Sequence, residues 1–581
     1  MTDTAPAAQK QAHDPKWWTL VAVCTGVFML LLDITIVNVA LFDIQADLDA
    51  SLSDVQWVID AYALSLAALL LTAGSLADLF GRKRVFVIGL LLFTGGSVLC
   101  GSATSVLFLS LSRAAQGIGG AAMFATALAL LASAFTGKDR GVAFAAFGAT
   151  TGLSVAIGPV VGGVLVSGLS WRWIFFVNIP ICAVALVVTL LRVQESHNPR
   201  AGRPDWIGFN TFSAALGALV YGLIEAGQHS WGETKVVACL IASVVLLALF
   251  VVSQLKRRDP MFDLSLLRKP TFTGGLVAAF GISAGVFALF TYLVLYLQGV
   301  LGFSAVKAGL IFLFLSGTSF LAAIVAGRLT EHVPVKWLIA PGFLVAGVGL
   351  LLMYGVDNSS DPSQWHHLIA GLLVTGAGIG MINPPLASTA VGVVPPAQSG
   401  MASGANSTFR QVGIATGIAA LGSILAQQVT SDVERGLSDV VPPQALGPLS
   451  EAISSGQVRV AAQIAGDGKA GEAVSRVGTQ AYVDGLNTVL LIGAILCLVA
   501  GAICLVMIRQ SDFDNAGRYD APAGGGDSDG SAHGSEAQAS DTDDSQPKHV
   551  APAAHEAPLE GGAHVAGAHA APEDDAKTAT T

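Results

Sequence analysis

The sequence predicts an all-α integral membrane protein with fourteen membrane-spanning helices. Of its 581 residues, 53% are hydrophobic and 12% are charged, whereas charged residues make up about 25% of an ordinary soluble domain. The apolar residues form long continuous runs rather than alternating with polar residues, which favours helices over the strands of a membrane barrel. The 66 glycines fit this class, because glycine is more frequent in membrane helices than in soluble ones.

Fourteen apolar runs approach or exceed the length of about 20 residues that a helix needs to cross a bilayer. The first run is too long, and too closely followed by others, for a cleaved signal peptide. All nine tryptophans fall at or just beyond the ends of runs, where the apolar ring and polar N–H of indole suit the membrane interface. The runs cover residues 18–41, 55–77, 85–103, 105–131, 141–167, 173–191, 206–226, 235–255, 272–298, 308–327, 337–355, 367–391, 402–427 and 486–508.

The basic residues between the runs predict the orientation of the chain. With a cytoplasmic N-terminus, the short inner loops carry 15 lysines and arginines, and the short outer loops carry three. Because cytoplasmic loops hold the excess of basic residues, we expect a multi-pass protein of the cytoplasmic (inner) membrane with both termini in the cytoplasm.

The order of the runs predicts four parts before the C-terminal tail. A short cytoplasmic segment, 1–16, precedes a first bundle of six helices over 17–192. Two linker helices follow over 206–255, and a second six-helix bundle occupies 272–508. Within that bundle, residues 428–485 are too polar to span and are expected to form a long outer loop, either functional or disordered.

The acidic character of the chain belongs to its C-terminal tail. Residues 509–581 hold 14 acidic and four basic residues, which accounts for the whole net charge of −10, and the first 508 residues are neutral. The tail lacks apolar periodicity and is expected to be a disordered cytoplasmic segment. No basic surface is left for nucleic-acid binding.

Several kinds of chemistry are excluded by the motifs that the sequence lacks. It contains no Gly-x-x-x-x-Gly-Lys-Ser/Thr loop for nucleotide hydrolysis, no Gly-x-Ser-x-Gly elbow and no cluster of ligands with metal spacing. The six cysteines all lie in apolar runs and are interpreted as packing residues. We therefore expect no metal, no cofactor and no catalytic residue.

Few ionisable side chains lie within the runs, and each is a candidate functional residue because charge in lipid is costly. Asp33 and Arg113 form the main candidate pair. At 1.5 Å per residue, both are expected to lie roughly 12 Å below the outer boundary. Such a pair is either a switch, in which a moving arginine or an arriving substrate controls proton binding, or a static ion pair that fixes helix packing.

Three further ionisable residues have open interpretations. Asp60, near the outer mouth, is either an extra site for cationic molecules or a residue in contact with water. Glu225, at the outer end of the seventh run, is interpreted as an exposed cap or as a site residue. Arg410 is predicted to face either the central cavity or the phosphate layer on the cytoplasmic side.

Two motifs carry structural information. The loop after the second run, GSLADLFGRKR, starts at Gly74 and places Asp78 at a helix end, followed by a turn at Gly81 and three bases from Arg82. A charged hinge of this kind can lock neighbouring helices through an ion pair. A degenerate copy, AGRLTEHVPVK, follows the tenth run, so the two six-helix halves are predicted to be internal repeats, as in secondary transporters.

The second motif, GLSVAIGPVVGG, lies in the fifth run. Gly158, Gly162 and Gly163 allow another helix to approach closely, and Pro159 bends its own helix and leaves a carbonyl free.

These motifs resemble those of the major facilitator superfamily. GSLADLFGRKR is similar to the signature loop of that family, and the resemblance covers about residues 17–508. LLDITIVNVAL and WRWIFFVNIP resemble its fourteen-helix drug:proton antiporter branch, the multidrug resistance exporters. Further matches are LSRAAQGIGGA, GLSVAIGPVVGG, YLVLYLQGVLGFSAVKAGL and FRQVGIATG.

The resemblance implies a major facilitator fold of two six-helix bundles with two extra linker helices, and transport by alternating access. It implies proton or substrate coupling at Asp33 and Arg113, gating by the 74–84 loop, and an antiporter motif at the interface of the halves.

The expected function is that of a proton-coupled antiporter that exports amphipathic, often cationic small molecules such as drugs. It would be driven by the proton motive force and act as a monomer. One alternative is a dedicated exporter of a single endogenous metabolite or antibiotic. A lipid flippase or a membrane enzyme on the same scaffold is disfavoured, and for an enzyme the reason is that none of the eleven histidines lies at mid-membrane depth.

Overall fold

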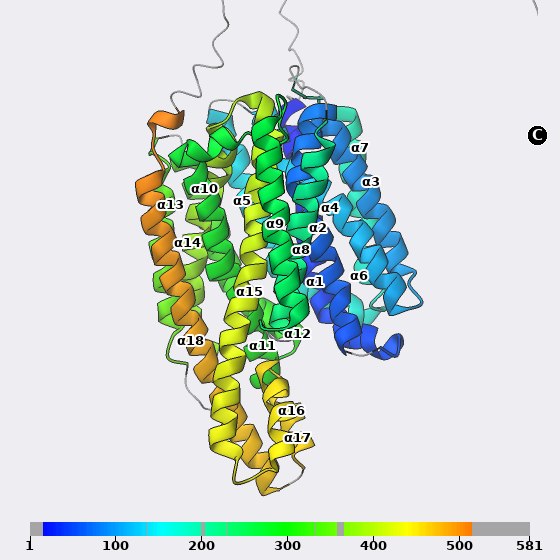
Figure 1. The fold of residues 1–581 in the computed structure, drawn as a ribbon, viewed down its shortest axis with the longest axis vertical. Coiled ribbons are helices and arrows are strands. Elements are labelled where there is room, and N and C mark those ends of the chain that lie inside the picture. The colour runs from blue at the N-terminus through cyan, green and yellow to red at the C-terminus, as the bar shows by residue number, and fades with distance from the viewer. Residues whose placement is uncertain are drawn as a thin grey trace, which may run out of the picture. The chain divides into compact units, whose positions relative to one another are not determined.

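The computed structural model describes residues 15–50, 52–135, 138–198, 204–228, 231–330, 332–356, 365–466 and 468–513 (Figure 1). Within these ranges the regular structure is entirely helical, and thirteen helices are long and apolar enough to cross a membrane. The remaining expected run, 141–167, also forms a long helix, α5, of 31 residues. The all-α membrane fold predicted from the sequence is confirmed.

The first half ends in a helix that is broken at a predictable position. The break falls at Val177, between α6 and α7. Pro180 explains it, because proline has no N–H and its ring clashes with the carbonyl group four residues earlier. The helices are α1 (Pro15–Asp47), α2 (Leu52–Phe80), α3 (Arg82–Gly101), α4 (Val106–Ala134), α5 (Lys138–Gly168), α6 (Trp173–Phe176) and α7 (Asn178–Arg192), followed by the linkers α8 (Trp206–Gln228) and α9 (Thr234–Lys256).

The second half begins with a helix that contains two π-helical turns. The ninth run is divided into α10 (Pro270–Ile282), η2 (Ser283–Phe287), α11 (Ala288–Leu295) and η3 (Tyr296–Val300), of which η2 and η3 are π-helical. Turns of this kind are rare and often mark functional positions. The other elements are η1 (Leu264–Arg268), α12 (Ala305–Leu329), α13 (Lys336–Met353), α14 (Trp365–Gly392), η5 (Pro396–Gln398), α15 (Ser399–Leu437), α16 (Pro443–Ser454), α17 (Val458–Ile464) and α18 (Lys469–Met507).

The expected outer loop, 428–485, is mostly helical. Helices α15 and α18 each have 39 residues and run past their apolar segments, and α16 and α17 fold between them (Figure 1). These four helices share a small apolar core that includes Val433, Leu449, Ile453 and Val474, all fully buried. A polar average composition concealed this core, because each helix buries only one face. We call this end of the molecule the hairpin end, and the opposite end, which carries Gly81 and Pro396, the loop end.

The two halves meet mainly along two pairs of helices, with further contacts of α4 with α15 and of α5 with α14. Helix α5 packs against α12, and α2 packs against α15. The linker α8 lies against both α2 and α15, and α9 packs on α8. Helix α9 turns large apolar side chains outward, among them Val244 at 68% and Leu255 at 71% exposure, as a lipid-facing helix does.

The tail begins later than the sequence predicted. The backbone N–H of Arg509 donates to the Thr271 hydroxyl at 2.8 Å, and Asp512 accepts a bond from the Thr271 N–H at 3.3 Å. Phe513 packs against the apolar cluster that contains Phe272. Residues 509–513 therefore belong to the packed helices, and the rest of the expected tail, 514–581, lies outside the described residues, as does the segment 1–14.

Candidate functional site

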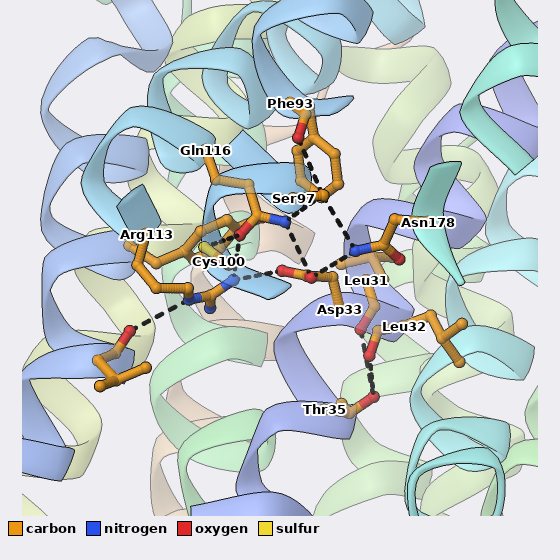
Figure 2. Close-up of polar contacts among 12 residues, drawn as sticks. Leu31, Leu32, Asp33, Thr35, Phe93, Ser97, Cys100, Arg113, Gln116 and Asn178 are labelled. Atoms are coloured by element: carbon orange, nitrogen blue, oxygen red, sulfur yellow. Dashed lines mark hydrogen bonds and ion pairs between the residues drawn. The ribbon is translucent and has the colours of Figure 1, made fainter. Parts of the chain in front are cut away.

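The structure brings Asp33 of α1 and Arg113 of α4 together in a fully buried cluster (Figure 2). Arg113 Nη1 lies 2.6 Å from Asp33 Oδ2. The other carboxylate oxygen accepts hydrogen bonds from Gln116 Nε2 at 3.0 Å and from Asn178 Nδ2 at 2.8 Å. The side chains of Asp33 and Arg113 are 0% and 1% exposed. The carboxylate is therefore held by three donors from two other helices.

The Arg113 guanidinium is enclosed by partners of several kinds. Its Nε donates to the Val58 carbonyl oxygen at 3.1 Å, and Nη1 also donates to Gln116 Oε1 at 2.7 Å. Its carbon lies 4.1 Å from the centre of the Tyr62 ring, close enough for a cation–π interaction. Protonating Asp33 would leave this buried positive charge without its counter-ion. The proton on Asp33 and the position of Arg113 are thus physically coupled.

Three polar residues of this cluster were missed by the sequence analysis. Ser97 accepts hydrogen bonds from Gln116 at 2.8 Å and from Asn178 at 3.3 Å, so it joins α3 to the site. Signals for two of them were available. Gln116 follows Arg113 by three residues, on the same helix face, and Asn178 stands two residues before the proline that breaks its helix. Uncharged polar residues are common in membrane helices, so these signals were weak.

The expected 74–84 loop is helical except at Gly81, because α2 ends at Phe80 and α3 begins at Arg82, and this segment joins the two halves at the loop end. Asp78 Oδ1 lies 2.8 Å from Arg82 Nη2 and accepts the Gly400 N–H at 2.9 Å, while Oδ2 accepts the Met401 N–H at 2.8 Å. Gly400 and Met401 stand in the first turn of α15. Asp78 therefore caps the N-terminus of that helix, where unpaired N–H groups and the helix dipole favour a negative charge. Arg82 completes the link by donating to the Pro396 carbonyl oxygen at 2.6 Å.

Two glycines of the loop are required by close contacts. Gly74 has no room for a Cβ atom, because the Gly400 carbonyl oxygen of the opposite half occupies that space. Gly81 has φ of 110°, a conformation that favours glycine, and faces the Glu195 carboxylate. Glu195 in turn accepts the backbone N–H groups of Lys83 and Arg84 at 3.0 and 3.1 Å.

The glycines of the expected antiporter motif contact two different partners. Gly158 packs on Thr35, and Gly162 packs on Ile36, both in α1 of the same half. A Cβ atom at Gly163 would lie 2.7 Å from Val306, in α12 of the other half. Of these three glycines, only Gly163 has a contact across the interface of the halves. The side chain of Pro159 lies outside the described residues.

The structure places Asp60 and Glu225 on neighbouring helices. Asp60 is half-buried in α2. Glu225 is 6% exposed and hydrogen-bonded to Tyr221, whose ring stacks on Trp57 of α2 at 5.8 Å between centres. The expected exposed cap is therefore wrong, because α8 turns Glu225 toward its neighbours rather than toward water.

Arg410 lines a small cavity between the halves. Its Nη2 donates to Asn383 Oδ1 at 2.5 Å. The cavity is lined by α4, α5, α14 and α15, and a second small cavity, lined partly by Phe287, Phe290 and Phe312, shares Asn383 with it. The residues around the first cavity are Phe124, Leu128, Phe147, Gly148, Thr151, Asn383, Ala387, Asn406, Ser407 and Arg410.

Comparisons with known proteins identify the family of the chain. The sequence profile of the Major Facilitator Superfamily matches residues 23–418. The chain is 36% identical over 425 residues to the multidrug resistance protein Stp of Mycobacterium tuberculosis, covering 73% of this chain and 78% of that protein. It is 31% identical over 542 residues to the tetracenomycin C resistance and export protein of Streptomyces glaucescens, covering 90% and 98% of the two chains.

The solved structures agree with this assignment at the level of the fold. The crystal structure of the human organic anion transporter MFSD10 has a TM-score of 0.53 and 15% identity to this chain, of which it covers 83%, and 99% of its own chain is matched. At that identity the likeness concerns the fold alone. With the profile match over more than half of the sequence, it follows that this chain belongs to the major facilitator superfamily and is a transporter rather than an enzyme.

Proposed function

We propose that this transporter is a proton-coupled antiporter, which exports amphipathic, often cationic small molecules by alternating access. The observation that carries the proposal is the buried Asp33–Arg113 pair. The Asp33 carboxylate can bind a proton, and Arg113 is the one basic side chain that pairs with it among the described residues. Relatives named for multidrug resistance and antibiotic export support the substrate class. No cofactor is needed beyond the proton motive force, and the partners are the substrate, protons and the bilayer, with a monomer as the transporting unit.

The proton step acts through the contacts of Asp33. In the paired state, Arg113 holds α1 and α4 together, and Asn178 ties α7 to the same carboxylate. A proton on Asp33 neutralises the carboxylate and makes the buried guanidinium unstable in its present position. The three helices then lose the interaction that fixes their relative position, which gives the first half a second arrangement.

The gating step acts at the loop end, which we assign to the cytoplasm together with both termini because basic residues gather there. The Asp78 contacts to Gly400 and Met401 hold the two halves together on that side. Opening toward the cytoplasm requires all of them to break. The direct test of the proposal is efflux of a fluorescent cationic dye from cells or vesicles, which must stop when a proton uncoupler is added. Efflux that continues without a proton gradient would contradict it.

A dedicated exporter of one compound is the second candidate function. One relative, of which this chain covers 98%, is named for the resistance to and export of a single antibiotic, tetracenomycin C. A panel of chemically unrelated dyes and antibiotics separates the two candidates, because a dedicated exporter would protect cells against one compound class only.

Asp60→Asn is expected to impair the export of dications more than that of monocations, and of neutral molecules least. At 4 Å and an effective dielectric constant of about 20, one charge contributes about 4 kcal/mol, and part of this attraction shifts affinity by about tenfold. The measurement is efflux of matched mono- and dicationic dyes, with the exposed Asp54→Asn as the control. Equal loss for all charges would make Asp60 a structural residue, and no loss would favour the dedicated exporter.

Truncation after Phe513 is expected to leave both transport and protein abundance intact. The removed residues are polar, acidic and without apolar periodicity, so they add little packing energy. Truncation after Gln510 is the matched comparison. It removes Asp512 and Phe513, which contact the helices, and should reduce the amount of folded protein in the membrane. A 513-residue protein that is abundant but inactive would show that the tail takes part in transport.

A further inference from the structure

Arg410 is a partly buried arginine with no acidic partner in the described part of the chain. Its guanidinium donates to the Asn383 amide oxygen at 2.5 Å, and no salt bridge joins it to an acidic side chain in the described part of the chain. Arg113, the other deep arginine, has a carboxylate at 2.6 Å. An arginine carries five N–H donors, so most of those of Arg410 are left for other acceptors. An isolated buried charge is costly unless something pairs with it.

Several polar residues line the same cavity as Arg410 and together could bind a ligand. Asn383 and Asn406 line the same cavity and are 5% and 4% exposed. The Asn406 side-chain oxygen is buried and has no hydrogen-bond partner among the described residues, so no bond to that oxygen prevents the amide from turning its NH2 group toward an anion in the cavity. Ser407 and Thr151 add hydroxyl groups to the cavity wall. The Thr151 hydroxyl donates to the Gly148 carbonyl oxygen at 2.7 Å, so the donors that remain for an oxyanion are the Arg410 guanidinium, the two amide groups and the Ser407 hydroxyl.

The cavity also has an apolar side. Phe124, Leu128, Phe147 and Ala387 also line it, and it shares Asn383 with the second cavity, which has three more phenylalanines. Both cavities lie between the two halves, on helices of each. The cavities are small in this arrangement of the halves. An amphipathic molecule with one acidic group would therefore meet the apolar wall and the cation only when the two halves move apart.

We propose that Arg410, with Asn383 and Asn406, binds the oxyanion group of an amphipathic molecule in the cavity between the halves. The inference rests on the proposed export function and extends its substrate class to molecules that carry a carboxylate or a similar acidic group beside those that carry a positive charge. The Asp33 carboxylate accepts hydrogen bonds from Arg113, Gln116 and Asn178. Arg410 is the charged residue that lines this cavity, so it is the group that can pair with a charged ligand there. The same oxyanion chemistry is offered by the phosphate group of a lipid, which the test must separate from a free small molecule.

The test is a binding titration on the full-length protein in phosphatidylcholine nanodiscs, at fixed ionic strength and without a proton gradient. The probes are 1-naphthoate and its uncharged amide, 1-naphthamide, and the titration is followed by calorimetry. We expect Arg410→Gln to weaken naphthoate binding at least about tenfold and to leave the weak binding of naphthamide unchanged. Asn406→Ala should weaken naphthoate binding to a smaller degree. Arg435→Gln is the matched control, because Arg435 stands on the same helix with a side chain that is 71% exposed.

The same titration in nanodiscs that contain phosphatidylglycerol separates the two sources of the anion. Naphthoate binding that persists there assigns the site to a free carboxylate, and binding that is lost by competition assigns it to a lipid headgroup. Either result supports an anion site at Arg410.

Equal naphthoate affinity in the wild type and in Arg410→Gln would overturn the proposal. A second measurement addresses folding, because removal of a partly buried charge that has no acidic partner should not lower the melting temperature. A lower melting temperature for Arg410→Gln, with no naphthoate binding by the wild type, would make Arg410 a structural partner of Asn383 and overturn it too. Dye efflux by the wild type is scored separately, so failure of the proton-coupled mechanism and failure of the anion site are distinguishable.

Discussion

Asp33→Asn is expected to reduce uncoupler-sensitive efflux to the background rate. The amide has nearly the size of the carboxylate, and its oxygen can still accept a hydrogen bond from Arg113, but it cannot take up and release a proton. The substitution leaves the Arg113 charge unbalanced in a position that is 1% exposed, and breaking a buried pair by removing one partner costs about 3–5 kcal/mol. The measurement is the initial efflux rate of a cationic dye, normalised to the amount of protein in the membrane.

Two further variants separate loss of coupling from loss of folding. Asp33→Asn combined with Arg113→Gln removes both charges, so it should restore protein abundance but not proton-driven efflux. Asp43→Asn, an exposed acid on the same helix, is the control and should transport normally. Uncoupler-sensitive efflux by Asp33→Asn at the wild-type rate would assign the pair to helix packing alone and remove the basis of the proton mechanism.

The parts of this molecule that could be predicted from sequence are those that depend on local chemistry. Each apolar run became a helix because a backbone in lipid must satisfy its own hydrogen bonds. The pairing of Asp33 with Arg113 could be predicted because the rise of 1.5 Å per residue places both side chains at the same depth in the membrane. The break at Val177 was also predictable in principle, because Pro180 stands three residues later.

The parts that could not be predicted depend on which helices become neighbours. The partner of Asp78 is the backbone N–H of Gly400, 322 residues later in the other half of the chain. The sequence of the loop motif does not indicate this partner. Glu225 is buried because α8 rests on α2 and α15. Likewise, the polar segment 428–485 forms helices because four helices together bury apolar side chains that a single helix would leave exposed to water.

Asp78→Asn is expected to open the loop end of the molecule and to slow transport. The carboxylate accepts two backbone N–H groups of α15 and pairs with Arg82, which is 3% exposed. An asparagine has one acceptor oxygen and no charge, so it cannot replace all of these contacts. Loss of a helix cap costs about 1 kcal/mol and loss of a buried charge partner about 3–5 kcal/mol. A change of 3 kcal/mol corresponds to a shift of about 100-fold in the equilibrium between closed and open states.

The opening can be measured at a cysteine introduced in the cavity. Ser407 is 2% exposed and lines the cavity beside Arg410, so Ser407→Cys reports access from the loop end. With the two half-buried cysteines replaced, Cys24→Ser and Cys239→Ser, a membrane-impermeant maleimide applied to inside-out vesicles should label the Asp78→Asn protein much faster than its parent.

Asp139→Asn provides the matched control for the gate. Asp139 also forms an ion pair at the start of a helix, with Lys16 at 2.9 Å, but its side chain is 44% exposed. Exposed pairs contribute only about 0–1 kcal/mol, so labelling and efflux should remain at the parental rates. If Asp78→Asn behaves like Asp139→Asn, the contact between Asp78 and α15 does not hold the loop end closed. In that case the closure must come from packing of Gly74 against Gly400, which leaves no room for a side chain. Substitution of Gly74 by alanine would then be the variant that opens the loop end.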